Sequence, residues 1–423
     1  MTPEIKQRIE QIRRGNVPEG YQKTKDGIFP TDWHTQKMKQ WVALAERPVT
    51  LEDDKRYRLV TVRRGFGGVD LRGEYLGKDI LVKNYFRARQ GDFLISKRQI
   101  AHGACGVVPE SLDGAVVSNE YNVFVPNQGT NIEMFNLMMQ LPHYTRLFYL
   151  MSDGVHIEKL LFKTQDWVRR QLAMPPIEEQ RKIAAILTTQ DKVIELKEKQ
   201  LAGKQRQKKY LMQQLLTGKK RLPGFSGAWK NIKLCEVLSE RKEKNIEQNL
   251  RICSVAVQKG VIDQIEHLGR SYAASDTSNY SVAHYGDIIY TKSPTGDFLY
   301  GIVKQNLLQE TVAVSPLYGV FTPMTFGLGY FLHTYFQSAI CAQNYLLPIV
   351  QKGAKNTINI TNDTFISSKL YLPLDVEEQK AIADTFIAAD REIDLLRQDI
   401  EQEKQKKKAL MQLLLTGIVR VKT

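Results

Sequence analysis

The sequence has little cysteine, and its cysteines are not placed to build a site. Its 423 residues include four, Cys105, Cys235, Cys253 and Cys341, and no two form a Cys-x-x-Cys pair. Scattered cysteines are typical of a reducing compartment, and they argue against a disulfide framework or a cysteine-built zinc site. The seven histidines also lack the spacing of metal ligands. We therefore expect no metal in this chain.

Segments that direct a chain to or across a membrane are missing as well. The N-terminal stretch MTPEIKQRIEQIRRG is charged throughout and does not resemble a signal peptide. No apolar run approaches the ~20 residues of a membrane-spanning helix. The sequence predicts a soluble protein of the cytoplasm.

Motifs of common catalytic sites are also absent. Met174-Pro-Pro-Ile177 lacks the polar first residue and the aromatic last residue of a methyltransferase motif. Gly77 and Lys78 are followed by Asp79, which excludes a P-loop there. No segment supplies a nucleophile together with its base. We interpret the chain as a binding protein and not an enzyme.

Positive charge, in contrast, is in excess. Lysine and arginine total 60 against 46 acidic residues, so the net charge is +14 and the isoelectric point is near 9.4. Such a balance favours a polyanionic partner, nucleic acid before any other. The length is enough for two to four domains with substantial cores.

An internal repeat organises the chain. The phrase LMQQLLTG at residues 211–218 returns as LMQLLLTG at residues 410–417, an offset of 199 positions. At that offset, residues 178–221 and 377–420 share 18 identities in 44 positions without a gap. The preceding regions match only at scattered points, such as GDFLISK at 91–97 with GDIIYTK at 286–292. The chain therefore consists of two repeat units, each a divergent domain followed by a well-matched segment.

Each matched segment predicts a long helix. Apolar residues recur along a heptad seam that includes Ile183, Leu187 and Ile194 in the first copy. Neither segment contains proline after the prolines that precede it, Pro175-Pro176 and Pro373. Gly218 and Gly417 stand where the glycine that ends a helix is expected. About 40 residues at ~1.5 Å each give a rod of roughly 60 Å. A seam of this kind needs a partner helix, so we expect the two helices to pair with each other, antiparallel and about a pseudo-twofold axis. The alternative is that each packs on its own domain.

The divergent domains have the pattern of an α+β fold. Short apolar runs bounded by glycine, asparagine and proline predict strands, for example at residues 92–96, 121–125, 251–257 and 286–290. One helix is expected over residues 131–150 and another over 328–344. The predicted order is an N-terminal helix and linker (1–26), a first domain (27–175), a central helix (176–222), a second domain (223–373) and a C-terminal helix (374–423).

Taken together, these residues resemble the specificity (S) subunits of type I restriction–modification systems. The resemblance rests on PIEEQRKIA at 176–184, LDVEEQKAIA at 374–383, the two LMQ phrases, RLPGFSGAW at 221–229 and GIFPTDW at 27–33. It spans the whole chain, and the combination of motifs is what makes it specific.

The resemblance implies a function and a set of partners. The two divergent domains would be target-recognition domains, each reading one half of a bipartite sequence in double-stranded DNA. The two helices would form an antiparallel coiled coil that spaces the half-sites and docks two methyltransferase (M) subunits. The M subunits carry S-adenosylmethionine and methylate adenine, and restriction (R) subunits add ATP- and Mg-dependent translocation and cleavage. No cofactor is expected in this chain itself.

Candidate contact residues follow from position and charge. Lysine and arginine after strands or in glycine-rich turns suit phosphates, and groups that reach a groove can contact bases. The candidates for DNA binding are Arg63, Arg64, Lys97, Arg98, Lys259, Lys292, Lys355 and Asn356, of which the matched Lys97 and Lys292 are the strongest. The candidates for contact with a partner subunit, at the starts of the helices, are Glu178, Glu179, Gln180, Glu377, Glu378 and Gln379.

Other functions remain open at this point. One is the specificity subunit of a type II bipartite methylation or restriction system, which sequence motifs do not separate from type I. Another is a coiled-coil scaffold that binds DNA without sequence preference, which predicts near-uniform affinity and a steep dependence on salt. The third is an enzyme with an unfamiliar site.

Overall fold

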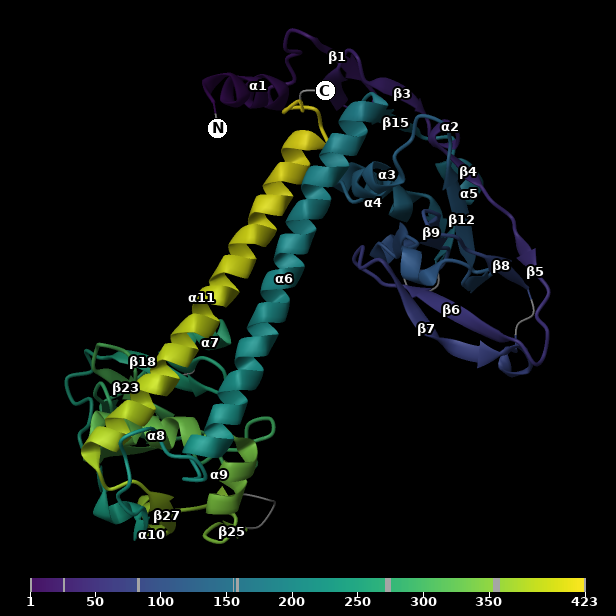
Figure 1. Cartoon of the computed structure of the whole chain (residues 1–423). Coiled ribbons are helices and arrows are strands. Elements are labelled where there is room, and N and C mark those ends of the chain that lie inside the picture. Colours follow the sequence, from purple (N-terminus) through teal and green to yellow (C-terminus); the bar gives the residue numbers. More distant parts are fainter. Residues whose placement is uncertain are drawn as a thin grey trace. The chain divides into compact units, whose positions relative to one another are not determined.

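The computed structural model describes residues 2–25, 27–81, 84–154, 156, 160–270, 275–352 and 358–421 (Figure 1). The chain forms two compact units, Met1–Lys197 with Asp399–Thr423, and Glu198–Gln398. Each unit boundary falls inside one of two long helices, α6 (Ile177–Leu215) and α11 (Val376–Leu414). Each unit therefore contains one domain and part of both long helices.

The domain of unit 1 is a sandwich of two sheets. The first sheet has the order β10-β9-β12-β4 and is antiparallel throughout; its strands are β4 (Val42–Leu44), β9 (Phe93–Ser96), β10 (Cys105–Val107) and β12 (Tyr121–Pro126). The second has the order β5-β8-β11-β6-β7; its strands are β5 (Pro48–Val49), β6 (Arg56–Val62), β7 (Val69–Leu76), β8 (Tyr85–Arg87) and β11 (Val116–Ser118). Within it, only β11 and β6 run parallel among the described strands.

Strand β9 shows how the sequence specifies this sandwich. Phe93, Leu94 and Ile95 are all 0% exposed. Phe93 and Ile95 face a core shared with helices α3 (Ile132–Met139) and α4 (Pro142–Leu150), whereas Leu94 faces the second sheet. An unbroken apolar run is the pattern of a strand that is covered on both faces.

The domain of unit 2 repeats this strand order. Its first sheet is β17-β24-β21-β22, and its second is β19-β18-β23-β20, in which β18 and β23 are the parallel pair. These strands are β17 (Leu238–Glu240), β18 (Arg251–Ala256), β19 (Gly260–Asp263), β20 (Ser281–Ala283), β21 (Ile288–Tyr290), β22 (Val303–Gln305), β23 (Val312–Val314) and β24 (Gly319–Pro323). The second sheet has one strand fewer than that of unit 1, because the place of β5 is taken by a single antiparallel bridge between Lys244 and Ser281 of β20.

One buried ion pair recurs in both sandwiches. In unit 1 the guanidinium of Arg47 donates to both carboxylate oxygens of Asp92, at 2.6 and 3.1 Å. In unit 2 Arg241 holds Asp287 in the same way, at 2.6 and 3.2 Å. Both carboxylate side chains are nearly buried, at 4% and 2% exposure. The aspartate of the repeated Gly-Asp sequence therefore forms an ion pair with a structural role. It joins the start of β9 to the end of β4 in unit 1, and the start of β21 to the end of β17 in unit 2.

The two long helices pair antiparallel in each unit, as predicted. In unit 1 Gln190 donates to Glu403 at 2.6 Å, and Lys197 contacts Asp399 at 2.7 Å. In unit 2 Lys204 contacts Glu392 at 2.7 Å, and Lys208 contacts Asp390. Residue numbers fall along α11 as they rise along α6, which is the mark of an antiparallel pair. Four polar residues of α6, Gln190, Lys197, Lys204 and Lys208, thus bind acidic residues of α11.

The ends of these helices and the shorter helices differ in detail from the prediction. Gly218 and Gly417 have φ of 68° and 70° and bond back to Leu215 and Leu414, so both copies end in the same left-handed turn. The single helices expected over 131–150 and 328–344 are each two: α3 and α4, and α8 (Phe326–Tyr335) and α9 (Ala339–Leu346). Pro142 starts α4 and the Ser338 side chain caps α9, which explains both breaks.

The remaining elements border the sandwiches. They are α1 (Pro3–Arg13), β1 (Tyr21–Thr24), β2 (Gly27–Pro30), β3 (His34–Lys37), α2 (Met38–Trp41), β13 (Ser152–Asp153), β14 (Leu161–Phe162), α5 (Thr164–Trp167), β15 (Gln171–Met174), β16 (Lys230–Lys233), α7 (Gln264–Leu268), β25 (Gln351–Lys352), β26 (Ile358–Asn359), α10 (Asn362–Ser367) and β27 (Lys369–Leu372). Short 3-10 turns occur at Gly77–Asp79, Ile100–His102, Glu110–Leu112 and Leu234–Glu236. Within the described ranges, every helix is too short or too polar to cross a membrane.

Candidate nucleic-acid interface

Three turns meet at one end of the sandwich in unit 1. They are the β6–β7 turn (63–68), the β9–β10 turn (97–104) and the β11–β12 turn (119–120). Backbone hydrogen bonds join them, from Gly65 N to His102 O at 2.7 Å, from Phe66 N to Gly103 O at 2.9 Å and from Lys97 N to Glu120 O at 2.9 Å. The three turns therefore form one continuous surface, the turn end of the domain.

Backbone geometry brings two of these turns into close contact. Phe66 has a φ of 59°, a left-handed conformation that is strained for a bulky residue. Its ring packs on Gly103, where an added Cβ would lie 3.0 Å from the ring. Strain of this kind is retained at sites where a fixed backbone is useful. The glycine-rich sequences of these turns thus serve close packing of one turn on another.

All four predicted DNA-binding residues of the first domain lie at this turn end. Arg63 pairs with Asp70 across the β6–β7 turn, and Arg64 next to it is exposed. The Arg98 guanidinium pairs with Glu120 at 2.7 Å, and the Lys97 ammonium donates to the Asn119 carbonyl at 2.6 Å. Lys97 and Arg98 are thus oriented by the β11–β12 turn, and Arg63 is oriented by its own hairpin. The sequence indicated Arg63 with Arg64 and Lys97 with Arg98 as candidates, but it did not indicate that the fold brings the two segments together.

Unit 2 has an equivalent turn end, formed by residues 257–259, 291–302 and 315–318. Lys259 is exposed on the β18–β19 turn. Lys292 follows β21 with a φ of 55°, and Gly301 approaches it so closely that an added Cβ would lie 2.9 Å from its backbone nitrogen. Partial burial lowers the pKa of Lys292, and the Glu240 carboxylate opposes that shift. Within the described ranges, no residue forms a hydrogen bond or ion pair with the Lys292 ammonium. Lys355 and Asn356 lie outside the described residues.

The two turn ends differ in chemistry. The turn end of unit 1 carries four cations, whereas that of unit 2 carries Lys259 and Lys292 beside two exposed leucines. Leu299 is 53% exposed and Leu317 is 72% exposed. Apolar side chains can contact the methyl group of thymine, and cations can contact phosphates or guanine. The two ends are thus suited to different DNA sequences.

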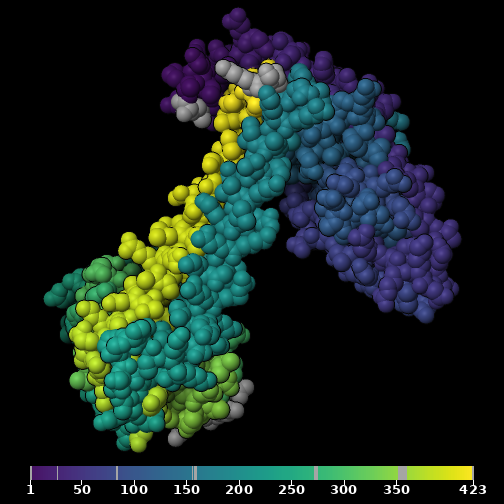
Figure 2. Space-filling model, in the orientation of Figure 1, coloured from purple at the N-terminus to yellow at the C-terminus, as the bar shows by residue number. Residues whose placement is uncertain are grey.

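Two of the three predicted partner-binding residues of α6 are buried and hydrogen-bonded inside unit 1. Glu179 is 0% exposed and accepts from Arg420 at 2.8 and 2.7 Å, while Gln180 is 1% exposed and accepts from the backbone of Asn131 at 2.8 Å. The C-terminal residues that carry Arg420 also contact the N-terminal segment, since the Tyr21 hydroxyl donates to the Gly417 carbonyl at 2.6 Å. Figure 2 shows this contact as yellow residues against purple ones.

The equivalent residues of α11 have the same role in unit 2. Glu378 is 1% exposed and accepts from Arg221 at 2.6 Å and from the Trp229 indole at 3.1 Å. Gln379 is 5% exposed and accepts from the Thr325 hydroxyl at 2.7 Å. The four buried side chains are thus hydrogen-bonded within their own units. Of the six candidates, Glu178 and Glu377 are exposed, and contact of the helix starts with a partner subunit stays a prediction.

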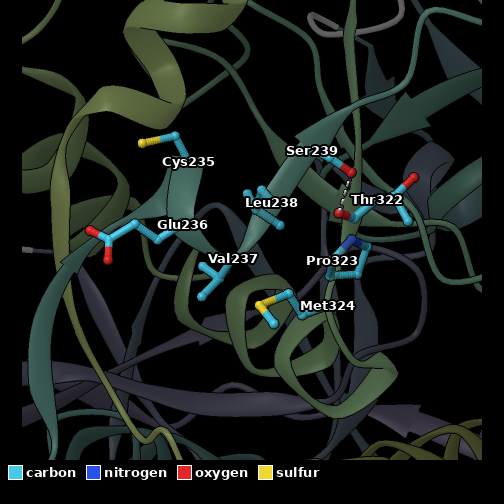
Figure 3. Close-up of a pocket in the computed structure, with 8 residues that line it drawn as sticks. All are labelled: Cys235, Glu236, Val237, Leu238, Ser239, Thr322, Pro323 and Met324. Atoms are coloured by element: carbon cyan, nitrogen blue, oxygen red, sulfur yellow. Dashed lines mark hydrogen bonds between the residues drawn. The ribbon is translucent and has the colours of Figure 1, made fainter.

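A recess in unit 2 offers little for nucleic acid. It lies beside the β17–β24 pair and is lined by Cys235, Glu236, Val237, Leu238, Ser239, Thr322, Pro323 and Met324 (Figure 3). Among these residues Glu236 is the one charged group, and it is an anion. No group of three or more histidine, cysteine or acidic residues suited to a metal occurs in the part of the chain that the structure describes.

Known proteins resemble this chain over different shares of its length. The model of the type I restriction modification DNA specificity domain matches residues 228–405. The specificity subunit of the type I restriction enzyme MjaVIII of Methanocaldococcus jannaschii is 25% identical over 295 residues, which are 63% of this chain and 65% of that protein. The putative MjaX specificity subunit of the same organism is 23% identical over 432 residues, covering 96% of this chain and 98% of that protein.

A solved structure shows the same fold. The crystal structure of the type I restriction–modification S subunit from M. genitalium matches with a TM-score of 0.56 at 10% identity, over 93% of this chain and 97% of that one. The family model, the relatives and the shared fold agree with the motifs at the starts and ends of the long helices. The chain is thus similar to type I restriction–modification specificity subunits in sequence and in fold.

Proposed function

We propose that the chain is the DNA sequence-recognition subunit of a type I restriction–modification complex and carries no catalytic site of its own. One observation supports this most. The two domains share their strand order, including the parallel pair, whereas their equivalent turn ends carry unlike side chains. A shared scaffold with unlike turns is what two readers of unlike half-sites require, because each base pair presents a different pattern of donors, acceptors and methyl groups.

The long helices have a separate role in this proposal. The antiparallel pair sets the separation of the two half-sites and docks two methyltransferase subunits, with the exposed Glu178 and Glu377 among the contacts. The methyltransferase subunits supply S-adenosylmethionine, and restriction subunits supply the ATP- and Mg-dependent steps. This division of labour is consistent with the absence of catalytic motifs from the sequence.

Exchange of one domain tests the proposal. Methylated adenines in host DNA are first mapped with and without this chain, which gives the target. Residues 27–175 are then replaced by the corresponding domain of another family member. We expect one half of the methylated sequence to change and the other half to stay. The reciprocal exchange of residues 223–373 is the control and should change the other half; a change in both halves from one exchange contradicts the assignment.

Lys292 provides a finer test of the turn end in unit 2. Because its ammonium has no partner among the described residues, Lys292→Ala should remove a DNA contact without breaking an internal one. We expect a loss of about 1–3 kcal/mol, roughly 5- to 150-fold in affinity, for duplexes that contain the intact second half-site. Lys97→Ala is the matched change in the other domain. An unchanged affinity for Lys292→Ala would remove this residue from the interface.

A further inference from the structure

A second charged surface lies in unit 2, away from the turn end. Strands β16 and β27 form a two-stranded antiparallel sheet in which Lys233 lies directly opposite Lys369. Side chains at such positions project from the same face with Cβ atoms about 4.5–5.5 Å apart, so like charges there are destabilising. Both lysines are exposed, and neither ammonium has an acidic partner within the described ranges. Two cations are thus held together without internal compensation.

Further cations surround this pair. Lys219 and Lys220 follow directly after Gly218. Gly218 packs on the same face of the sheet, because an added Cβ there would lie 3.2 Å from the Tyr371 ring. Both lysines are exposed. We call the surface formed by Lys219, Lys220, Lys233 and Lys369 the basic ribbon.

The basic ribbon lies at the end of the domain opposite the turn end. Strand β24 starts at the 315–318 turn and ends at Pro323, which pairs with Leu238 at the start of β17. The ribbon strand β16 leads into β17 through the short turn Leu234–Glu236. The ribbon is therefore separated from the turn end by the length of a strand, and its contacts are distinct from those that read bases.

Unit 1 carries cations at the equivalent place. Strands β3 and β15 form the matching sheet, with Lys37 opposite Gln171. Backbone bonds from Met38 to Arg170, at 2.8 Å, and from Leu234 to Ser368, at 3.1 Å, show that the two sheets correspond. The exposed cations here are Lys37, Lys39, Arg169 and Arg170. Positive charge recurs in both units although most of the individual positions that carry it differ.

We infer that the basic ribbon binds the DNA backbone and anchors the duplex independently of its sequence. Phosphate recognition requires a cation near the strand but no fixed side-chain identity, which fits a charge that recurs at different positions. A protein partner is the weaker explanation, because lysine is depleted from protein–protein interfaces. This inference rests on one part of the proposed function, namely that the chain binds DNA.

The test uses the full-length chain and two 60-base-pair duplexes, one with the mapped target and one of scrambled sequence. Binding is measured from about 0.05 to 0.3 M KCl for the wild type and for Lys233→Gln/Lys369→Gln. Each lost phosphate contact lowers the salt slope by about 0.9, so the double variant should lose about 1.8 in slope and on the order of tenfold or more in affinity for both duplexes near 0.15 M. The ratio between target and scrambled duplex should stay the same.

Controls separate this inference from the proposed function. Lys192→Gln/Lys209→Gln removes the same charge from exposed positions on α6 and should leave the slope nearly unchanged. A wild type without preference for the target overturns the recognition role but not the ribbon. An unchanged slope in the ribbon variant overturns the ribbon. Unchanged DNA binding combined with loss of copurified partner subunits also overturns it and identifies the surface as a protein contact.

Discussion

Arg221→Met destabilises unit 2 by about 3–5 kcal/mol, the cost of leaving a buried carboxylate without its cation. Glu378 is 1% exposed and receives hydrogen bonds from Arg221 and from the Trp229 indole. The Arg221 guanidinium also lies 5.5 Å from the Trp229 ring centroid, so the substitution removes a stacked contact as well. The effect is measured by urea unfolding of the full chain, with one probe for each unit.

Two further variants identify the cause as the unpaired charge. In Arg221→Met/Glu378→Gln the buried anion is gone while the amide oxygen still accepts from Trp229, so much of the lost stability should return. Arg397→Met breaks an exposed pair with Asp394, 50% and 64% exposed, and should change stability by no more than about 1 kcal/mol. A double variant as unstable as Arg221→Met alone would show that the loss comes from packing and not from charge.

The same pair shows which contacts of the helix starts could not be predicted from the sequence. Glu179 and Glu378 match between the repeats, and their position at a helix start pointed to a partner subunit. Their cations, Arg420 and Arg221, match between the repeats too, at the far end of the segment. When an acidic and a basic residue both recur in the two repeats, they can be expected to form an ion pair with each other. The residues of the first pair are 241 positions apart, so no local pattern could reveal it.

The long helices and the strands were easier to predict, for a physical reason. A heptad seam and an apolar run are local patterns, and burial of Ile183 or Phe93 follows from them directly. The contact between Arg47 and Asp92 joins residues that are 45 positions apart, so it depends on how two strands pack in the folded domain. The turn end likewise depends on the packing of three turns that are separated in the sequence. The candidate cations of the first domain could therefore be predicted from the sequence, but their partners, Asp70, Asn119 and Glu120, could not.

Lys304 also has neighbours that are distant in the sequence, and its burial is expected to destabilise unit 2. It lies in the middle of β22 and is 4% exposed. Burial, and after it the Lys208 ammonium, lower the pKa of Lys304 to about 8, and the Asp390 carboxylate opposes the shift. Asp390 is already bound by Lys208 and by the Tyr330 hydroxyl, the latter at 3.0 Å. His333 on α8 also faces this group, and burial keeps it neutral by lowering its pKa well below the ordinary value.

Lys304→Met should therefore stabilise unit 2 at neutral pH. In the unfolded chain the Lys304 ammonium has its ordinary pKa of 10.5, and the difference from about 8 corresponds to about 3 kcal/mol as an upper estimate. Below pH 8 the folded protein bears this cost in full, because the group is charged in both states. Between pH 8 and 10.5 the unfolded state binds more protons, so the stability of the wild type rises with pH. Methionine fills a similar volume without a charge, so the variant should start more stable and lack this rise.

The measurement is the difference in unfolding free energy between wild type and variant from pH 7 to 10.5. Using the difference cancels the titration of tyrosines and surface lysines, which both proteins share. We expect Lys304→Met to be more stable by up to about 3 kcal/mol at pH 7 and the gap to narrow as pH rises. Lys242→Met, at an exposed position, is the control and should give a small, constant difference. A gap that stays constant across this range would mean that Lys304 is charged at little cost in the folded domain, which in turn would require Asp390 to compensate both lysines at once.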